Sequence, residues 1–477
     1  MKDLYQKGQI FVAYGPKASV GNFYLPPFYY QLHYLVSLIT NFSPVIMKYL
    51  ITLVEAFTPL LLFLILKKIT YERNAFFSSL IYIFASFPTI FGTSEWNPNM
   101  IPFLSTLTLF CLLEYILKNK KIALIIGLIA TTIAIHLHYQ AVVLIPFVFI
   151  VFCWSIIKRK TDFKYWLIGI FLSFLTFVPY FYTELNNNFT NTKNIYFFFA
   201  QEHSKYFDRV SKVNYVFNFF PEFIEKILIG KNVNYNFFGK IIFYLGMIVL
   251  SFTALVKKDK TSRWILIYFT SIFVMLRIYK GDKVEFYLST LFILPVILIS
   301  YIFYLKKYQV LTYIFILFIA YFSGSYLGSN KNYNEIKDVK NIMHSIDQVA
   351  KGKNVRLSFY NDDFVNTFAY GFNEYTQTKI DKNSLLIVEI CDKEKKCFHH
   401  GKKISYLNNK IYTYNYFLKS LGGGSQYLAE IKTDPNYKYN IYISSIAVEP
   451  KGLEQYNYLI EKKFNYGSDF LLQDIIY

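Results

Sequence analysis

Residues able to handle a sugar and a phosphate recur in the short polar segments between the long apolar runs of this chain. Carboxylates and imidazoles accept a proton from an attacking hydroxyl, cationic side chains neutralise a departing phosphate, and amides and aromatic rings bind sugar hydroxyls and ring faces. The candidates are Glu95, His138 and Glu184 for acid–base chemistry, Lys17, Arg277 and Lys280 for a phosphate, and Tyr24, Trp96, Asn97 and His136 for a sugar or acceptor. This inventory suits a sugar carried on a lipid phosphate, although polar and aromatic loops also flank the spans of any membrane protein.

His136 and His138 are the imidazole pair that could hold a metal ion. A His-x-His sequence at a helix end directs its two rings to different faces of the helix. The cysteines show no zinc-type spacing either. We therefore predict that the protein has no metal site.

The composition is that of a membrane protein. Of the 477 residues, 54% are hydrophobic and only 17% are charged, whereas a soluble chain carries about a quarter charged residues. The net charge of +19 could indicate a nucleic-acid partner. Most basic residues, however, lie in short loops between apolar runs, as membrane insertion requires. The lipid bilayer is therefore the expected partner, and no nucleic acid is expected.

Ten apolar runs have roughly the 17–25 residues that cross a bilayer. They are 45–67, 75–93, 99–117, 121–138, 140–157, 163–182, 237–256, 263–279, 286–305 and 308–327. A shorter run, 27–40, begins at Pro26-Pro27 and carries Gln31 and His33. We interpret it as a helix lying in the membrane interface, with a short spanning helix as the alternative.

Basic residues fall at every second connection between these runs. They are Lys67-Lys68 with Arg73, Lys118 with Lys120-Lys121, Lys158-Arg159-Lys160, Lys257-Lys258 with Lys260 and Arg263, and Lys306-Lys307. Because cytoplasmic loops are enriched in Lys and Arg, this alternation places the five basic connections in the cytoplasm. The N-terminal segment, the 183–236 loop and the tail are then outside the cytoplasm.

The predicted fold class is an all-α polytopic membrane protein with a small C-terminal extracytoplasmic α/β domain. Its predicted parts are 1–44, an extracytoplasmic loop with the interfacial helix; 45–327, the transmembrane helical domain with the large outer loop 183–236; and 328–477, the extracytoplasmic domain. The expected location is the inner or plasma membrane of the cell, in multi-pass form.

The tail, 328–477, is expected to contain one helix over Glu335–Ala350. Gly422-Gly423-Gly424 precedes no phosphate-binding helix, so we interpret it as a turn or hinge. Cys391 and Cys397 either form a disulfide, which an oxidising compartment would allow, or remain free thiols. Aliphatic and aromatic enrichment predicts strands at Val355–Phe359, Ser384–Ile390, Ile411–Tyr414 and Ile441–Ser445.

Glu55 lies near the middle of the first predicted span. An acid inside the membrane is a candidate for a proton or ion pathway. The alternative is a structural carboxylate that is satisfied by hydroxyl groups or by a basic residue such as Lys48.

The segment from Tyr14 to Tyr30, YGPKASVGNFYLPPFYY, resembles the first outer loop of bacterial GT-C glycosyltransferases. These enzymes are relatives of protein mannosyltransferases that use polyprenyl-phosphate sugars. Further outer corners that resemble the family, in the same order, are Trp96–Asn99, His136–Tyr139, the Pro179–Thr192 region and the Tyr279–Pro295 region. The resemblance covers roughly 1–327.

The resemblance implies a helical bundle with its active site on the outer face. The implied reaction moves a sugar from a lipid-linked donor to an envelope glycan, lipid or protein, with no cofactor because the phosphate itself leaves. In the family, an acid in the first outer loop is the general base. Here that acid and the first span would fall ahead of residue 1, and Asp3 is not assigned the role. We therefore expect the chain as written to lack the family's first helix and acidic motif and to show no detectable transfer.

A transporter or flippase for an envelope lipid or polysaccharide is the alternative function. Transporters place their binding site near the midplane, often between repeated halves. The predicted spans are nearly free of charge at the midplane and show no repeated halves, which favours the enzyme. A third alternative is a structural membrane protein with an adhesive tail.

Overall fold

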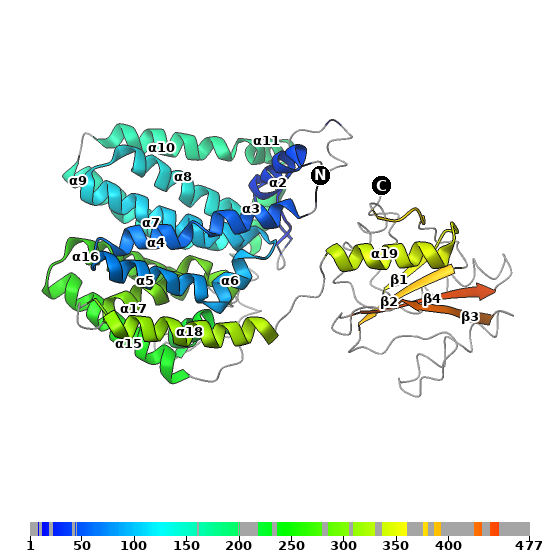
Figure 1. Ribbon diagram of the computed structural model, residues 1–477. Coiled ribbons are helices and arrows are strands. Elements are labelled where there is room, and N and C mark those ends of the chain that lie inside the picture. Colours follow the sequence, from blue (N-terminus) through cyan, green and yellow to red (C-terminus); the bar gives the residue numbers. More distant parts are fainter. Residues whose placement is uncertain are drawn as a thin grey trace. The chain divides into compact units, whose positions relative to one another are not determined.

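The chain forms two compact units in the computed structural model, Met1–Asn330 and Lys331–Tyr477, which we describe separately (Figure 1). In the first unit the structure describes 12–18, 22–40, 45–159, 162–198, 218–230, 236–278, 285–304 and 309–329, with isolated residues 8, 43 and 200. In the second unit it describes 336–359, 375–379, 386–392, 424–431 and 439–447.

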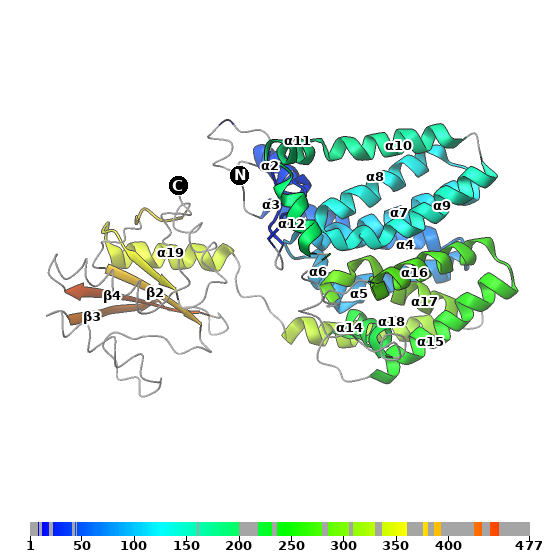
Figure 2. The same ribbon diagram turned by 180° about the vertical axis from the view of Figure 1, so that it is seen from behind.

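The described part of the first unit is a bundle of helices (Figures 1 and 2). Its α-helices are α2 Phe28–Ile39, α3 Ile46–Glu55, α4 Thr58–Leu66, α5 Glu72–Phe84, α6 Ser86–Gly92, α7 Ile101–Lys118, α8 Lys121–Leu137, α9 Ile145–Lys158, α10 Phe163–Thr176, α11 Val178–Asn186, α12 Thr190–Phe197, α14 Phe220–Ile229, α15 Asn236–Ser251, α16 Lys260–Ile278, α17 Leu294–Ile302 and α18 Gln309–Ser329. Shorter helical turns precede or extend some of them: η1 Asn97–Met100, η2 Tyr139–Leu144, η6 Phe252–Val256 and η7 Glu285–Leu291.

Several of these helices are long and apolar enough to cross a membrane. Five qualify alone: Ile46–Leu66, Asn97–Lys118, Tyr139–Lys158, Phe237–Val256 and Val310–Leu327. The bent pairs α5–α6 and α10–α11 raise the number to seven if each pair is one span. Within the described residues the chain is thus a multi-pass helical membrane protein. The count of ten spans stays a prediction.

Proline accounts for three helix breaks. Pro59, Pro88 and Pro179 each lack the N–H that would bond the carbonyl four residues earlier, and each ring crowds that carbonyl. The α3–α4 break, the 65° bend of α5–α6 and the 52° bend of α10–α11 lie just before these prolines. The positions of these three interruptions are therefore set by the prolines in the sequence.

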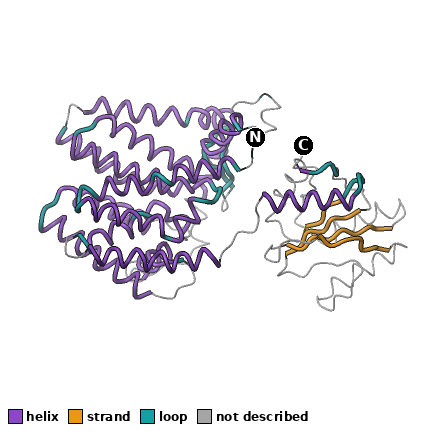
Figure 3. Tube along the Cα trace, in the orientation of Figure 1, coloured by secondary structure: helices purple, strands orange, loops and turns teal. Residues whose placement is uncertain are grey.

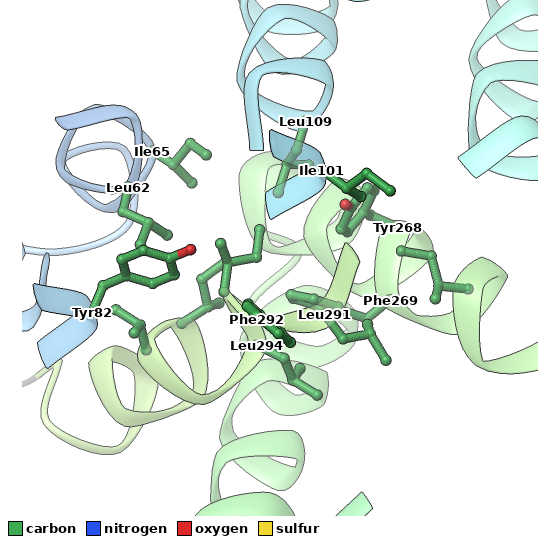
Figure 4. Packing of buried hydrophobic residues seen from close by; sticks show 14 of the residues in the cluster. Leu62, Ile65, Tyr82, Ile101, Leu109, Tyr268, Phe269, Leu291, Phe292 and Leu294 are labelled. Atoms are coloured by element: carbon green, nitrogen blue, oxygen red, sulfur yellow. The ribbon is translucent and has the colours of Figure 1, made fainter. Parts of the chain in front are cut away.

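The core is built around α7. In the candidate span that contains α7, 78% of the residues are buried, against 22–39% in the other four. Gly127 of α8 allows close packing, because a Cβ there would lie 3.3 Å from that of Cys111. Figure 4 shows Leu62 of α4 and Tyr82 of α5 facing the cluster that contains Leu109 of α7.

Four of the five basic connections meet at one end of the bundle, which we call the basic end; the fifth, Lys306-Lys307, lies outside the described residues. Each is tied to another by side-chain contacts, so their common side follows from the fold and not only from charge. The contacts are Lys68–Glu114, Thr70–Tyr304, Arg159–Tyr115 and Lys260–Ile116. The opposite end, which carries α2, α11 and α12 (Figure 2), is called the outer end below.

The second unit combines α19, Ile336–Ala350, with a four-stranded sheet (Figure 3). The strands are β1 Arg356–Phe359, β2 Leu386–Asp392, β3 Gly424–Ile431 and β4 Tyr439–Ala447, in the order β1-β2-β4-β3. β1 and β2 are parallel, and the other two pairings are antiparallel.

Most tail elements lie where the sequence predicts them. α19 matches the expected helix, and β1, β2 and β4 overlap three expected strands. The turn predicted at Gly422–Gly424 is wrong at Gly424, which begins β3 and pairs with Ala447. The strand predicted at Ile411–Tyr414 and the partner cysteine Cys397 lie outside the described residues.

Candidate functional site

Two N-terminal segments, 14–18 and 22–25, pair with each other at the outer end, and we call them the hairpin arms. Gly15 N donates to Leu25 O at 2.8 Å, and Leu25 N donates to Pro16 O at 2.9 Å. A Cβ on Gly15 would lie 2.3 Å from Pro26 O, so only glycine fits this close backbone approach. Lys17, paired with Tyr24 across the arms, is exposed.

Glu184 of α11 holds the first arm. Its Oε1 accepts a hydrogen bond from the Tyr14 hydroxyl at 2.8 Å. Its Oε2 accepts from both the N–H and the hydroxyl of Thr192, each at 2.6 Å. Glu184 is fully buried, and both oxygens are occupied, so it is placed as a structural clamp between the arm, α11 and α12. This arrangement does not favour the acid–base role predicted from the sequence.

Asn191 of α12 holds the second arm through the backbone of Tyr24. Its Oδ1 accepts from Tyr24 N at 2.6 Å, and its Nδ2 donates to Tyr24 O at 3.0 Å and to the Tyr180 hydroxyl at 2.9 Å. Asn194 adds a bond from Nδ2 to Asn22 O at 2.7 Å. The Tyr24 ring is thereby left half-exposed and stacks on Tyr14 at a centroid distance of 5.4 Å.

The Trp96–Asn99 corner is held by its two asparagines. Asn97 Nδ2 donates to Leu137 O at 2.5 Å, at the end of α8. Asn99 Nδ2 donates to Phe91 O at 2.7 Å, near the end of α6. Both asparagines are buried. Their amides donate hydrogen bonds to carbonyls at the ends of helices, which have no partner within the helix. Of the predicted sugar contacts at this corner, Trp96 remains exposed.

The two histidines occupy different surroundings. His136 is completely buried, its Nε2 is 2.9 Å from Thr176 Oγ1, and its ring lies against Phe177 at 3.9 Å. His138 lies between α8 and η2, and its Nδ1 accepts from Gln140 N at 3.3 Å. The burial of His136 does not favour direct contact with a sugar.

Glu95 is the outer-end carboxylate that stays open. It lies in the connection between α6 and η1, is exposed, and accepts no hydrogen bond from the residues that the structure describes. Although Glu95 is exposed, the atoms around its carboxylate partly desolvate it, which raises the pKa of Glu95, and the nearby Lys48 ammonium opposes that change. A carboxylate with a raised pKa and free oxygens is suited to accept a proton.

The predicted phosphate ligands are only partly located. Lys17 is exposed on the hairpin arms, and Arg277 is exposed in the last turn of α16. Lys280 lies outside the described residues. The expected convergence of Glu95, His138, Lys17 and Lys280 in one cavity therefore stays a prediction.

Glu55 corresponds to the structural alternative that the sequence left open. Its Oε2 accepts from the Thr58 and Tyr82 hydroxyls, each at 3.2 Å, and its Oε1 accepts from Phe103 N at 3.0 Å. The carboxylate thus links the α3–α4 break, α5 and the first turn of α7. Acids near a helix N-terminus are favoured by the helix dipole.

Sequence reasoning missed Tyr14 and Thr192, which complete the clamp around Glu184. Tyr14 lies 170 positions from its partner, and no periodicity or spacing connects them. Among the described residues, no group of three or more His, Cys, Asp or Glu side chains is arranged to hold a metal ion.

A solved structure shares the fold of this chain, in agreement with the fold that the sequence resemblance predicts. The crystal structure of ArnT from Cupriavidus metallidurans bound to undecaprenyl phosphate matches this chain with a TM-score of 0.53. The match covers 93% of this chain and 91% of that chain at 11% sequence identity, so the likeness is one of fold. No protein-family model and no curated protein matches the sequence.

Proposed function

We propose that this protein is a membrane glycosyltransferase that takes a sugar from a polyprenyl-phosphate carrier at the outer end of its helical bundle. The observation that carries the proposal is the fold match to ArnT bound to undecaprenyl phosphate, which extends over 93% of the chain. The open carboxylate and exposed cations at the outer end supply the kinds of group that the reaction needs. The acceptor is proposed to be an envelope glycan, lipid or protein outside the cytoplasm.

The proposed reaction is a displacement at the anomeric carbon. An acceptor hydroxyl attacks that carbon, the bond between carbon and the phosphate oxygen breaks, and the polyprenyl phosphate leaves with the bonding electrons. Glu95 is proposed to take the hydroxyl proton, because it is the outer-end carboxylate whose oxygens accept no hydrogen bond from the described residues. Transfer that depends on Glu95 would overturn the expectation, drawn from the sequence, of no detectable transfer. General base catalysis of this kind contributes about 10²–10⁴-fold.

Lys17, Arg277 and Lys280 are proposed to neutralise the donor phosphate, since cations beside a departing phosphate stabilise its developing charge. Tyr24 and Trp96 are proposed to contact sugar rings, because both rings are exposed at the outer end. His138 is proposed to lie near a hydroxyl of the sugar or the acceptor. Glu184, Asn97 and His136 then act by holding these residues in place.

The test uses the 477-residue chain in lipid nanodiscs. Binding is measured as the thermal shift produced by undecaprenyl phosphate, and transfer is measured with a panel of labelled undecaprenyl-phosphate hexoses and pentoses. We expect a saturable shift for the wild type and a weaker one for Lys17→Gln. Where transfer occurs, Glu95→Gln should reduce kcat by about 10²–10⁴-fold without weakening donor binding.

Glu72→Gln is the matched control, because Glu72 is an exposed glutamate at the basic end, paired with Lys67. This variant should keep both donor binding and any transfer. A wild-type chain that is not stabilised by undecaprenyl phosphate and transfers no sugar would contradict the proposed function. Transfer that survives Glu95→Gln would remove Glu95 from the mechanism and leave the class of enzyme intact.

A further inference from the structure

The basic end holds one carboxylate among three ammonium groups. Glu114, in the last turn of α7, pairs through Oε1 with Lys68 and with Lys118 at 3.2 Å. Its Oε2 pairs with Lys120 at 2.7 Å. When all four side chains are ionised, the three ammonium groups outnumber the one carboxylate, and the group carries a net charge of two positive units.

The other ion pairs of the described residues at this end are balanced. Lys67 pairs with Glu72 at 2.6 Å, and Lys121 pairs with Asp162. Each of these acids has a single basic partner among the described ion pairs. Among the described ion pairs at this end, the Glu114 cluster is therefore the group in which lysines outnumber acids.

Two of the three lysines remain accessible to a ligand. The side chains of Lys118 and Lys120 are 56% and 58% exposed, whereas that of Lys68 is only 12% exposed. Burial lowers the pKa of Lys68, Glu114 raises it, and Lys118 lowers it. Lys68 and Glu114 thus form the buried base of the cluster, and the two outer ammonium groups face solvent.

The helix that follows the cluster strengthens the attraction for an anion. Lys120 is the N-cap residue of α8, and its side chain makes no capping bond to the first turn. The N–H groups of that turn carry the partial positive charge of the helix dipole. A phosphate beside Lys118 and Lys120 would therefore meet two ammonium groups and the start of a 17-residue helix.

Apolar surface adjoins this charge. Ile122 and Ile126 lie one turn apart at the start of α8, and both are exposed, Ile122 by 73%. The cluster also lies at the end of Asn97–Lys118, a helix able to span a membrane. An anion with acyl chains fits charge and apolar surface together, whereas free phosphate fits the charge alone.

We propose that Lys118 and Lys120 bind the phosphate of an anionic phospholipid whose acyl chains lie along α8 beside Ile122 and Ile126. Lys68 and Glu114 position the two ligand lysines. The inference does not depend on the proposed transferase activity, because it concerns the opposite end of the bundle.

The experiment uses the full chain, delipidated in detergent. Phosphatidylglycerol, phosphatidylcholine or inorganic phosphate is titrated in at low salt, and retained lipid is measured by native mass spectrometry alongside the melting temperature. A basic residue whose charge is not balanced by an acid contributes about fivefold to the binding of an anionic lipid. The double variant Lys118→Gln with Lys120→Gln should therefore bind phosphatidylglycerol about 30-fold more weakly at low salt.

Lys67→Gln is the matched control, because it removes one charge from the same end but breaks a balanced pair. It should retain phosphatidylglycerol as the wild type does. Ile122→Ser should weaken the lipid without changing any charge. The proposal is overturned if phosphatidylcholine or inorganic phosphate stabilises the wild type as strongly, or if the double variant binds phosphatidylglycerol as well as Lys67→Gln does.

Discussion

The two ends of the helical bundle are held together by different chemistry. At the basic end, short connections are joined by ions: Glu114 with three lysines, and Arg159 bonded to the carbonyls of Tyr115 and Ile116 at the end of α7. At the outer end, neutral amides and hydroxyls hold separate segments, as Asn191 does for Tyr24. Ionic contacts fix the first end, and directional hydrogen bonds arrange the second.

The proposed function accounts for this difference between the two ends. Excess positive charge on one side orients a membrane protein during insertion, and the same lysines and arginines can then bind helix C-termini. A site that handles a sugar needs defined backbone positions, which hydrogen bonds provide more strictly than long charged side chains. Glu184 combines both features, since it is an acidic residue that holds its neighbours through directional hydrogen bonds.

The largest expected effect on stability comes from a substitution at the basic end. Glu114→Gln should lower the free energy of unfolding by about 3 kcal/mol, because a buried ion pair that loses one partner leaves an uncompensated charge. Lys68 is the charge that would be left in a poorly solvated position. The measurement is thermal unfolding in detergent at two salt concentrations.

Glu72→Gln is the control for that loss, since its pair with Lys67 is exposed and such pairs are worth about 0–1 kcal/mol. Equal melting temperatures for Glu114→Gln and Glu72→Gln would show that the Glu114 cluster does not hold the basic end together.

At the outer end, Glu184→Ala should cost about 2 kcal/mol, because buried donors on Tyr14 and Thr192 lose their acceptor. The effect should concentrate in the hairpin arms. Hydrogen exchange at residues 14–18 and 22–25 should accelerate while exchange in α7 stays slow. If exchange accelerated equally over the whole bundle, Glu184 would stabilise the entire bundle and not only the hairpin arms.

Asn191→Ala should produce a smaller effect, about 1 kcal/mol, because it removes hydrogen bonds to one residue of one arm and to Tyr180. Unlike Glu114→Gln, its effect should be almost independent of salt, since no net charge changes. A strong salt dependence of the Asn191→Ala loss would contradict the division between the two ends. The control is Asn187→Ala, whose amide bonds only the Tyr14 hydroxyl at 3.2 Å.

The smallest effect is the pH dependence at Glu95. Its pKa is raised by partial burial, so the folded state favours the protonated form, and the resulting stabilisation is lost as pH rises through that pKa. Below about pH 4, near the ordinary pKa of a glutamate, Glu95→Gln and the wild type should therefore have the same melting temperature. At pH 8 the melting temperature of the variant should be slightly higher than that of the wild type. Melting curves from pH 4 to 8 provide the check. A variant that melts below the wild type at pH 8 would show that the ionised carboxylate is stabilising.

The sequence predicts the membrane helices and the two ends because both depend on local signals. Span length and lysine position can be read one segment at a time, as can α19 and three of the four strands. Pro88 is a local signal for the break between α5 and α6, but the continuous apolar run 75–93 predicts a single span there. The ten-span count and the placement of the lipid-linked donor go beyond these signals and stay predictions.

The roles at the outer end depend on distant partners and could not be predicted in the same way. Glu95 and Glu184 are both outer-loop acids in the sequence, yet one is open and the other is fully bonded. The difference is made by Tyr14, 170 residues from Glu184, and by Thr192, which bonds the other carboxylate oxygen. Asn97, which the sequence predicts as a sugar ligand, is buried, and its amide donates to Leu137 O, 40 residues away.

The link between Asn191 and the second hairpin arm has a consequence for how the protein can diverge. Because the amide binds main-chain and not side-chain atoms of Tyr24, the fold constrains position 191, and among these contacts only the stacking on Tyr14 restricts the side chain at position 24. Drift or selection can therefore exchange that ring for another group while the arm keeps its place. A lineage could acquire a different ligand preference at position 24 through a single substitution, with little loss of stability.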